Sequence, residues 1–181
     1  MFILASKSPR RKELLSSLIK DFLIVPSNID ESKYKLEELS IKKAEAIAIY
    51  YPNDYILSAD TYVILDEIVY GNPKDKADAY KILNTLQNKT HNVTTYFTIM
   101  NKQKSICITK RVDTLVRFNK MTKKEILNYI ASNSPMDKAG AYGIQDNDKY
   151  HFIHSIEGSL TNVIGLPVDE LKKVLIELNI I

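Results

Sequence analysis

The sequence is poor in several residues that would indicate a specialised class of protein. Its 181 residues include one cysteine, Cys107, and no tryptophan. A lone cysteine excludes a disulfide within the chain and is typical of proteins in a reducing compartment. Glycine is scarce, with 5 residues, whereas lysine, isoleucine, asparagine and tyrosine are abundant. This bias is typical of AT-rich coding, so we give individual lysines and asparagines little weight.

Long apolar runs are also absent. No segment approaches the roughly 20 apolar residues that a membrane-spanning helix needs. Lys7 follows the apolar segment Met1–Ala5 almost at once, so we expect no signal peptide. The net charge of +3 is too small to indicate nucleic-acid binding. With 45% hydrophobic and 26% charged residues, the composition predicts a soluble cytoplasmic protein, organised as one domain over residues 1–181.

Hydrophobic periodicity predicts helices and strands that alternate along the chain. Helical spacing covers residues 10–19, 36–51, 74–87, 122–131 and 168–178. Apolar runs predict strands over residues 2–5, 22–25, 55–57, 62–65, 68–70, 91–100, 105–118 and 150–156. Polar segments over residues 27–35, 132–148 and 158–167 are expected to be loops, and Asp66–Glu67 is expected to form a hairpin turn before residues 68–70. Thr122 is the predicted N-cap of the fourth helix, with Glu125 at the capping-box position. The mixture predicts an α/β or α+β fold with a mixed sheet.

A helix start coincides with a cluster of positive charge near the N-terminus. Ser8 is a predicted N-cap, and Pro9 suits the first helical position. Free backbone N–H groups at a helix start, joined by Arg10 and Arg11 on the first turn, would suit a phosphate group. The alternative is a capped surface helix with solvated arginines.

Acidic residues in two segments are candidates for metal binding or acid–base chemistry. Asp60 follows the predicted strand 55–57, and α/β proteins often place ligand-binding residues at strand ends. Its carboxylate could bind a divalent cation or orient a water molecule, or simply bond its own loop. The pair Asp30–Glu31 could add oxygen ligands for magnesium or manganese, although acidic pairs in polar loops are usually solvated.

The glycine-containing segment 137–145 is a further candidate. Gly140 and Gly143 would let the backbone approach a ligand closely, and Gln145 offers the donor and acceptor needed to read a base edge. The glycine spacing matches neither a P-loop nor a dinucleotide-binding motif. Lysines such as Lys43 and Lys138 are ambiguous singly. His91 is expected to be structural, since the histidines form no zinc pattern with Cys107.

Taken together, these segments resemble the Maf family, the septum-formation-associated nucleoside triphosphate pyrophosphatases. Residues 4–15 resemble its opening L-A-S-x-S-P-R-R-x-E-L-L motif, and residues 58–61 and 137–145 resemble its second and third motifs. Residues 71–73 stand in the place of a G-K-P element, and residues 91–95 in that of H-x-V-x-T. Residues 158–167 resemble the last motif, so the resemblance covers nearly the whole chain.

The resemblance implies a two-lobed mixed sheet flanked by helices, with a central nucleotide-binding cleft. It implies cation-dependent hydrolysis of nucleoside triphosphates to the monophosphate and pyrophosphate, with a house-cleaning role and a link to cell-division arrest. Asp60 would accept a proton from water, and Glu31 would join it at the metal. The remaining substrate-binding residues implied by the resemblance are Ser6, Ser8, Arg10, Arg11, Lys43 and Lys138.

Base preference within the family is implied by three positions. The branch that acts on dTTP and UTP carries arginine, threonine and glutamine there, and this chain has Arg10, Thr61 and Gln145. The branch that acts on methylated GTP has a bulky aromatic residue in place of the arginine. The chain therefore resembles the dTTP/UTP pyrophosphatase branch. Homodimers would fit the family, although no interface patch is evident in the sequence.

Two departures from the family pattern leave a second hypothesis open. Asn72 replaces the lysine of the G-K-P element, and Ser134 replaces a glutamate before the third motif. Each loss removes a charged contact worth roughly 1.5–3 kcal/mol. The alternative to the enzyme is therefore a nucleotide-binding regulatory protein with reduced catalysis. A nucleic-acid-binding domain is the least favoured option, because no basic face interleaved with aromatic residues supports it.

Overall fold

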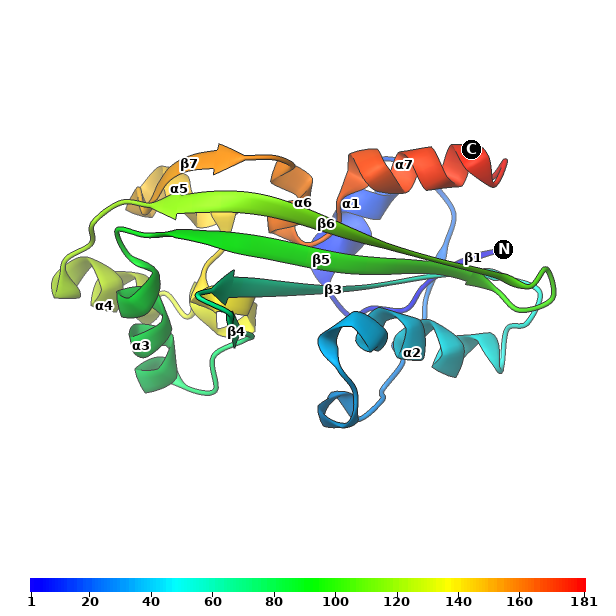
Figure 1. The fold of residues 1–181 in the computed structure, drawn as a ribbon, viewed down its shortest axis with the longest axis horizontal. Helices are drawn as coiled ribbons and strands as arrows, with labels where there is room; N and C mark the ends of the chain where they lie inside the picture. Colours follow the sequence, from blue (N-terminus) through cyan, green and yellow to red (C-terminus); the bar gives the residue numbers. More distant parts are fainter. The chain divides into compact units, whose positions relative to one another are not determined.

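A mixed α/β fold is built around one open sheet. The computed structural model describes residues 1–181. Its 7-stranded sheet has the order β2-β1-β3-β5-β6-β7, and β4 pairs with β3 (Figure 1). The strands are β1 (Phe2–Leu4), β2 (Leu23–Ile24), β3 (Tyr55–Leu65), β4 (Ile68–Tyr70), β5 (Thr90–Asn101), β6 (Ile106–Phe118) and β7 (Ile153–Glu157). The predicted α/β class with a mixed sheet is confirmed.

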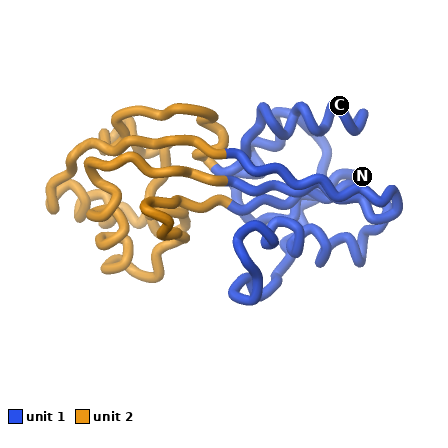
Figure 2. The backbone as a smooth tube through the Cα atoms, viewed as in Figure 1, with its two compact units in different colours: residues 1–60, 95–112, 165–181 blue, residues 61–94, 113–164 orange.

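Helices flank the sheet, and none of them combines the length and apolar character needed to cross a membrane. The α-helices are α1 (Pro9–Ser16), α2 (Leu36–Ala48), α3 (Lys76–Leu86), α4 (Lys123–Ala131), α5 (Asn147–Tyr150), α6 (Leu160–Ile164) and α7 (Val168–Glu177). Four short 3₁₀ helices are η1 (Glu31–Lys33), η2 (Ser134–Asp137), η3 (Ala139–Ala141) and η4 (Ile144–Asp146). The chain divides into unit 1, residues 1–60, 95–112 and 165–181, and unit 2, residues 61–94 and 113–164 (Figure 2).

In unit 1, both faces of the sheet are covered. Strand β1 pairs in parallel with β2 and β3, and all of its residues are buried. Alternate residues point to opposite faces of a strand. Ile3 therefore packs with Ala44 and Ile47 of α2, whereas Leu4 packs with Leu15 of α1 and with α7. Figure 1 shows α2 on one side of the strands and α1 with α7 on the other.

In unit 2, the helices cover one face only. Val116 and Phe118 of β6 join the core formed with α3 and α4, whereas Leu115, which precedes Val116 and points to the opposite face of the strand, is 45% exposed. Helix α4 begins with the predicted capping box, because Thr122 accepts from the Glu125 backbone N–H and the Glu125 carboxylate accepts from Thr122. Local sequence signals thus set this helix start, and packing against the sheet sets its buried face.

The turn between β3 and β4 was also predicted correctly. Asp66 and Glu67 have φ values of 50° and 65°, which are both in the left-handed region. Two consecutive positive φ values match the right-handed twist of a tight hairpin. The register Leu65↔Ile68 confirms the two-residue turn.

Several predicted boundaries were wrong. The segment Ser58–Thr61 was expected to interrupt two strands, but β3 runs unbroken from Tyr55 to Leu65. Asp60 therefore lies inside a strand and not at its end. Polar side chains are tolerated there because α2 supplies an acceptor for the Ser58 hydroxyl and a donor for one oxygen of Asp60. The predicted loops also contain η1 to η4, α5 and α6, while β7 is shorter than expected.

His91 is a structural residue, as predicted. Its side chain is 2% exposed and its Nε2 lies 2.7 Å from the Tyr142 hydroxyl. The ring meets Phe118 edge-on, with centroids 4.8 Å apart. Burial lowers the pKa of His91 from 6.5 to about 4, so the folded protein keeps the ring neutral at pH 7.

We predict that His91 makes stability depend on pH between about 6.5 and 4. The unfolded chain gains a proton at this residue below pH 6.5, whereas the folded chain does so only near pH 4. As the pH is lowered from 6.5 to 4, the free energy of unfolding should therefore fall by about 2–3 kcal/mol. Above pH 6.5 the contribution of His91 should not change with pH. Urea unfolding of the wild type and His91→Gln at pH 7 and 4.5 measures the difference.

The control is His154→Gln, because His154 is exposed. It should keep the wild-type pH dependence, whereas His91→Gln should flatten it. Equal pH dependence in all three proteins would contradict the assignment.

Candidate active site

Hydrogen bonds join Ser6, Ser8 and Arg11 around the start of helix α1 in unit 1. Ser8 caps α1 by accepting from the Arg11 backbone N–H at 3.4 Å, as predicted. Ser6 Oγ accepts from the Ser8 N–H at 3.2 Å and from Arg11 Nη1 at 3.3 Å. Arg11 Nε also donates to the Gly165 carbonyl at 2.9 Å, which ties the first motif to the last. These hydrogen bonds hold the first turn of α1 in place. Arg10 lies on the same turn and is half-buried.

A buried ion pair joins α2 to β3 in the same unit. Lys43 Nζ donates to Asp60 Oδ1, and it lies 2.8 Å from Glu31 Oε1. Lys43 is 8% exposed and Asp60 is 6% exposed, whereas Glu31 reaches in from the exposed helix η1. The structure therefore brings together three of the predicted site residues. It leaves Asp30 apart from them, because Asp30 caps η1 by accepting from Ser32.

The environment of Asp60 makes its carboxylate a stronger base than usual. Burial raises the pKa of Asp60, and the nearby Lys43 ammonium and Arg11 guanidinium oppose that rise without cancelling it. Asp60 Oδ2 is buried and makes no hydrogen bond. A buried acceptor without a partner is costly and is uncommon in folded proteins. Asp60 therefore has one oxygen held by Lys43 and one buried oxygen without a hydrogen-bond partner.

A row of buried hydroxyls supports the ion pair, and sequence reasoning missed it. Ser58 donates to the Ser40 carbonyl, Ser40 Oγ lies 2.9 Å from Thr98 Oγ1, and Thr98 Oγ1 lies 2.8 Å from Thr109 Oγ1. Ser58 stands two residues before Asp60 and so shares its face of β3. Ser40 stands one helical turn before Lys43. That spacing was the only signal in the sequence, and it does not reveal that the two segments meet.

The carboxylates fit a divalent cation in part. No group of three or more histidine, cysteine, aspartate or glutamate side chains is arranged to hold a metal ion. Magnesium, however, is usually held by one or two carboxylates together with substrate phosphates and water. Asp60 Oδ2 and the Glu31 carboxylate are the available hard oxygen donors, and the Lys43 ammonium lies between these residues. Asp60 and Glu31 are therefore the residues of this cluster that could hold a cation.

In unit 2, the side chains of Lys138 and Gln145 both lie close to the backbone at Gly143. A Cβ added at Gly143 would lie 2.5 Å from Lys138 Cε and 3.0 Å from Gln145 Oε1. A side chain at position 143 would therefore have to displace the Lys138 side chain from its present path. Lys138 Nζ donates to the Ser134 carbonyl and lies 2.8 Å from Asp137 Oδ1. The Lys138 ammonium thus has oxygen partners although Ser134 has replaced the family's glutamate.

The segment around Asn72 lies beside the same loop. The Gly140 N–H donates to the Gly71 carbonyl at 3.0 Å. Gly140 has φ +70°, and a Cβ there would lie 2.5 Å from Val63 Cγ2. Both facts require glycine. Asn72 therefore lies next to the segment that carries the third motif, and Thr61 follows Asp60 along β3.

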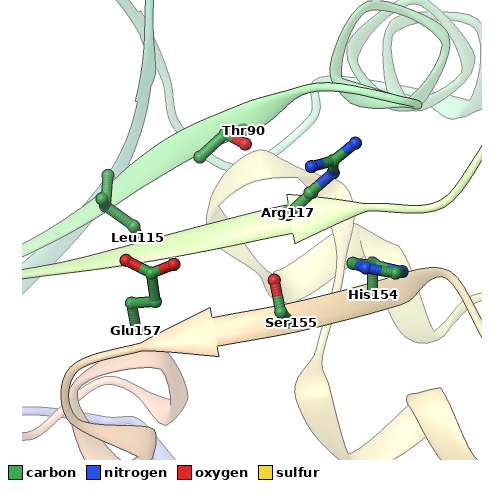
Figure 3. Close-up of a pocket in the computed structure, with 6 residues that line it drawn as sticks. All are labelled: Thr90, Leu115, Arg117, His154, Ser155 and Glu157. Atoms are coloured by element: carbon green, nitrogen blue, oxygen red, sulfur yellow. The ribbon is translucent and has the colours of Figure 1, made fainter.

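A shallow surface pocket of unit 2 contains none of the predicted site residues. It lies on the uncovered face of the sheet, between the ends of β5, β6 and β7 (Figure 3). Every residue that lines it is exposed. The lining residues are Thr90, Leu115, Arg117, His154, Ser155 and Glu157.

Comparison with known proteins finds relatives along nearly the whole chain. A protein with 43% identity over 176 residues, named dTTP/UTP pyrophosphatase, occurs in Citrifermentans bemidjiense, with 93% of this chain and 91% of that protein aligned. Proteins of the same name in Clostridium beijerinckii and Acholeplasma laidlawii are each 41% identical, with 97% and 100% of this chain covered and 98% of each relative. The sequence model of the family described as Maf-like protein matches residues 1–178, so the chain belongs to the Maf-like family.

Proposed function

We propose that the chain is a nucleoside triphosphate pyrophosphatase that acts on dTTP, UTP and modified pyrimidine triphosphates. Water adds to the α-phosphorus, the phosphoanhydride bond breaks, and the products are the nucleoside monophosphate and pyrophosphate. The observation that carries this proposal is the buried Asp60 carboxylate, which is held at one oxygen by Lys43 and has no hydrogen-bond partner at the other. Relatives that align along nearly their whole length are named dTTP/UTP pyrophosphatases.

Asp60 is the proposed proton acceptor. General bases work best when their pKa lies close to the working pH, and burial moves the pKa of Asp60 in that direction. Lys43 fixes one carboxylate oxygen, which leaves Oδ2 to accept the proton of the attacking water. Glu31 and Asp60 would hold the divalent cation, and a bound cation supplies charge neutralisation on the triphosphate.

Phosphate binding is proposed for the start of α1. Ser6, Ser8, Arg10 and Arg11 surround this helix N-terminus, and backbone N–H groups with arginines stabilise charge on a leaving pyrophosphate. We assign a further phosphate contact to Lys138. Base preference is assigned to Arg10, Thr61 and Gln145, with the Gln145 amide pairing with the pyrimidine edge.

The second candidate remains a nucleotide-binding regulatory protein with reduced catalysis. Asn72 favours it, because an exposed asparagine stands where the family has a lysine. Ser134 favours it less, because its carbonyl and hydroxyl still hold the Lys138 ammonium. We extend the family's house-cleaning role and association with division arrest to this chain. The free, exposed Cys107 is consistent with the proposed cytoplasmic location.

Pyrophosphate release from purified protein tests the proposal. The protein is incubated with each common triphosphate and with magnesium or manganese, and pyrophosphate and monophosphate are measured. We expect release from dTTP and UTP, at a higher kcat/KM than from any purine triphosphate, and loss of activity with a chelator. Binding of these nucleotides without release would favour the regulatory candidate, and preference for a purine would overturn the branch assignment.

Asp60→Asn should abolish most turnover while leaving nucleotide affinity nearly unchanged. Asparagine keeps the size of the side chain and can still accept from Lys43, but it cannot take up a proton. Loss of a general base lowers kcat by about a hundred- to ten-thousandfold. The measurements are kcat for dTTP and Kd from calorimetry.

Asp54→Asn is the matched control. Asp54 lies just before β3 in the same unit and pairs with the N-terminal ammonium at 2.9 Å. It should retain wild-type kcat. Full turnover by Asp60→Asn would remove Asp60 from its proposed role.

A further inference from the structure

One tyrosine hydroxyl spans both sides of Gln145. The Gly143 N–H donates to the Tyr129 hydroxyl at 3.0 Å, and that hydroxyl donates to Asp146 Oδ2 at 2.7 Å. The Asp146 N–H in turn donates to the Gly143 carbonyl at 3.0 Å. The loop Gly143–Asp146 is thereby closed on itself and fastened at each end to the same oxygen atom.

Tyr129 is itself held rigidly. It lies on helix α4, its side chain has no exposed surface, and its ring packs 5.0 Å from Phe152 and 4.8 Å from Tyr150, measured between centroids. Burial raises the pKa of the Tyr129 phenol, so the hydroxyl stays protonated and acts as a donor at any physiological pH. A fixed point on a regular helix therefore sets the position of an irregular loop.

The hydrogen bonds continue in one direction to Lys138. Lys138 Nζ donates to Ser134 Oγ at 3.1 Å, and Ser134 Oγ donates to Asp146 Oδ2 at 2.7 Å. Asp146 is thus the common acceptor of two hydroxyls, and each hydroxyl accepts from a further N–H donor. Each donor in this series of hydrogen bonds has an acceptor. A partly buried polar network stiffens a site when its members are satisfied in this way.

From this geometry we propose that Tyr129 is a positioning residue that fixes the Gly143–Asp146 loop, and through it the Gln145 side chain, for recognition of the pyrimidine. The inference rests on the proposed function, because it assigns a role in the choice of substrate. Asp146 and Ser134 link Tyr129 to Lys138 in this network, and neither of the two is assigned to proton transfer or to phosphate binding. Loosening the loop should therefore affect base preference more than turnover.

Tyr129→Phe is the test, since it removes the hydroxyl and keeps the ring. The KM and Kd for dTTP and UTP should rise by about tenfold, while the values for purine triphosphates and kcat for dTTP change little. The ratio of affinities for dTTP and dGTP should fall by the same factor. Amide hydrogen exchange should show faster exchange at Gly143. A role confined to stability would lower activity on all nucleotides equally and leave this ratio unchanged.

Tyr142→Phe is the matched control. It also deletes a buried tyrosine hydroxyl from the core of unit 2, but that hydroxyl pairs with His91. The nucleotide ratio and exchange at Gly143 should remain at wild-type values. If Tyr129→Phe does not fold, Asp146→Ala is the second variant, because it removes the half-buried carboxylate that accepts from the Tyr129 hydroxyl. It should also lower the ratio of affinities for dTTP and dGTP.

The outcomes separate the two proposals. A wild-type protein that prefers pyrimidines, together with variants that keep this preference, would overturn the role of Tyr129 and leave the proposed function intact. A wild-type protein that releases no pyrophosphate would overturn the proposed function. In that case the affinity ratio for dTTP and dGTP still decides whether Tyr129 positions the loop.

Discussion

The buried ion pair between Lys43 and Asp60 is the interaction on which the rest of unit 1 depends. A lone carboxylate in this position would be strongly disfavoured, and the ammonium from α2 makes its burial tolerable. The pair fixes α2 against β3, and the Ser58–Ser40 hydrogen bond fastens the same two elements beside it. Because Lys43 satisfies only one oxygen of Asp60, the arrangement that stabilises the fold leaves the other oxygen without a hydrogen-bond partner, and that oxygen is the proposed proton acceptor.

Unit 2 reaches a defined geometry by different means. Its functional segment is a series of 3₁₀ turns, which have few main-chain hydrogen bonds of their own. Glycines at positions 140 and 143 let Val63, Lys138 and Gln145 approach the backbone closely. The hydroxyl of Tyr129 then supplies hydrogen bonds that the irregular backbone lacks. A regular helix therefore positions the irregular loop that carries Gln145, the residue proposed to read the base.

Features set by neighbouring residues could be predicted from the sequence, whereas features set by distant ones could not. Ser8, the Thr122–Glu125 capping box and the Asp66–Glu67 turn are local, and all were predicted correctly. Asp60 was recognised as a candidate site residue but was wrongly placed at the end of a strand. In the sequence, the polar residues Ser58–Thr61 look like a break between two strands, because their partners on α2 cannot be seen there. Tyr129 gave no signal, since its hydroxyl meets Gly143 and Asp146 only after folding.

A double-mutant cycle on the Lys43–Asp60 pair tests the central claim most directly. The free energy of unfolding is measured for the wild type, Lys43→Met, Asp60→Asn and the double variant. Removing Lys43 alone strands a buried carboxylate and should cost about 3–5 kcal/mol. The double variant should lose clearly less than the sum of the single losses, because the remaining partner no longer carries an uncompensated charge. Losses that simply add would show that the two residues are not coupled and would contradict the account.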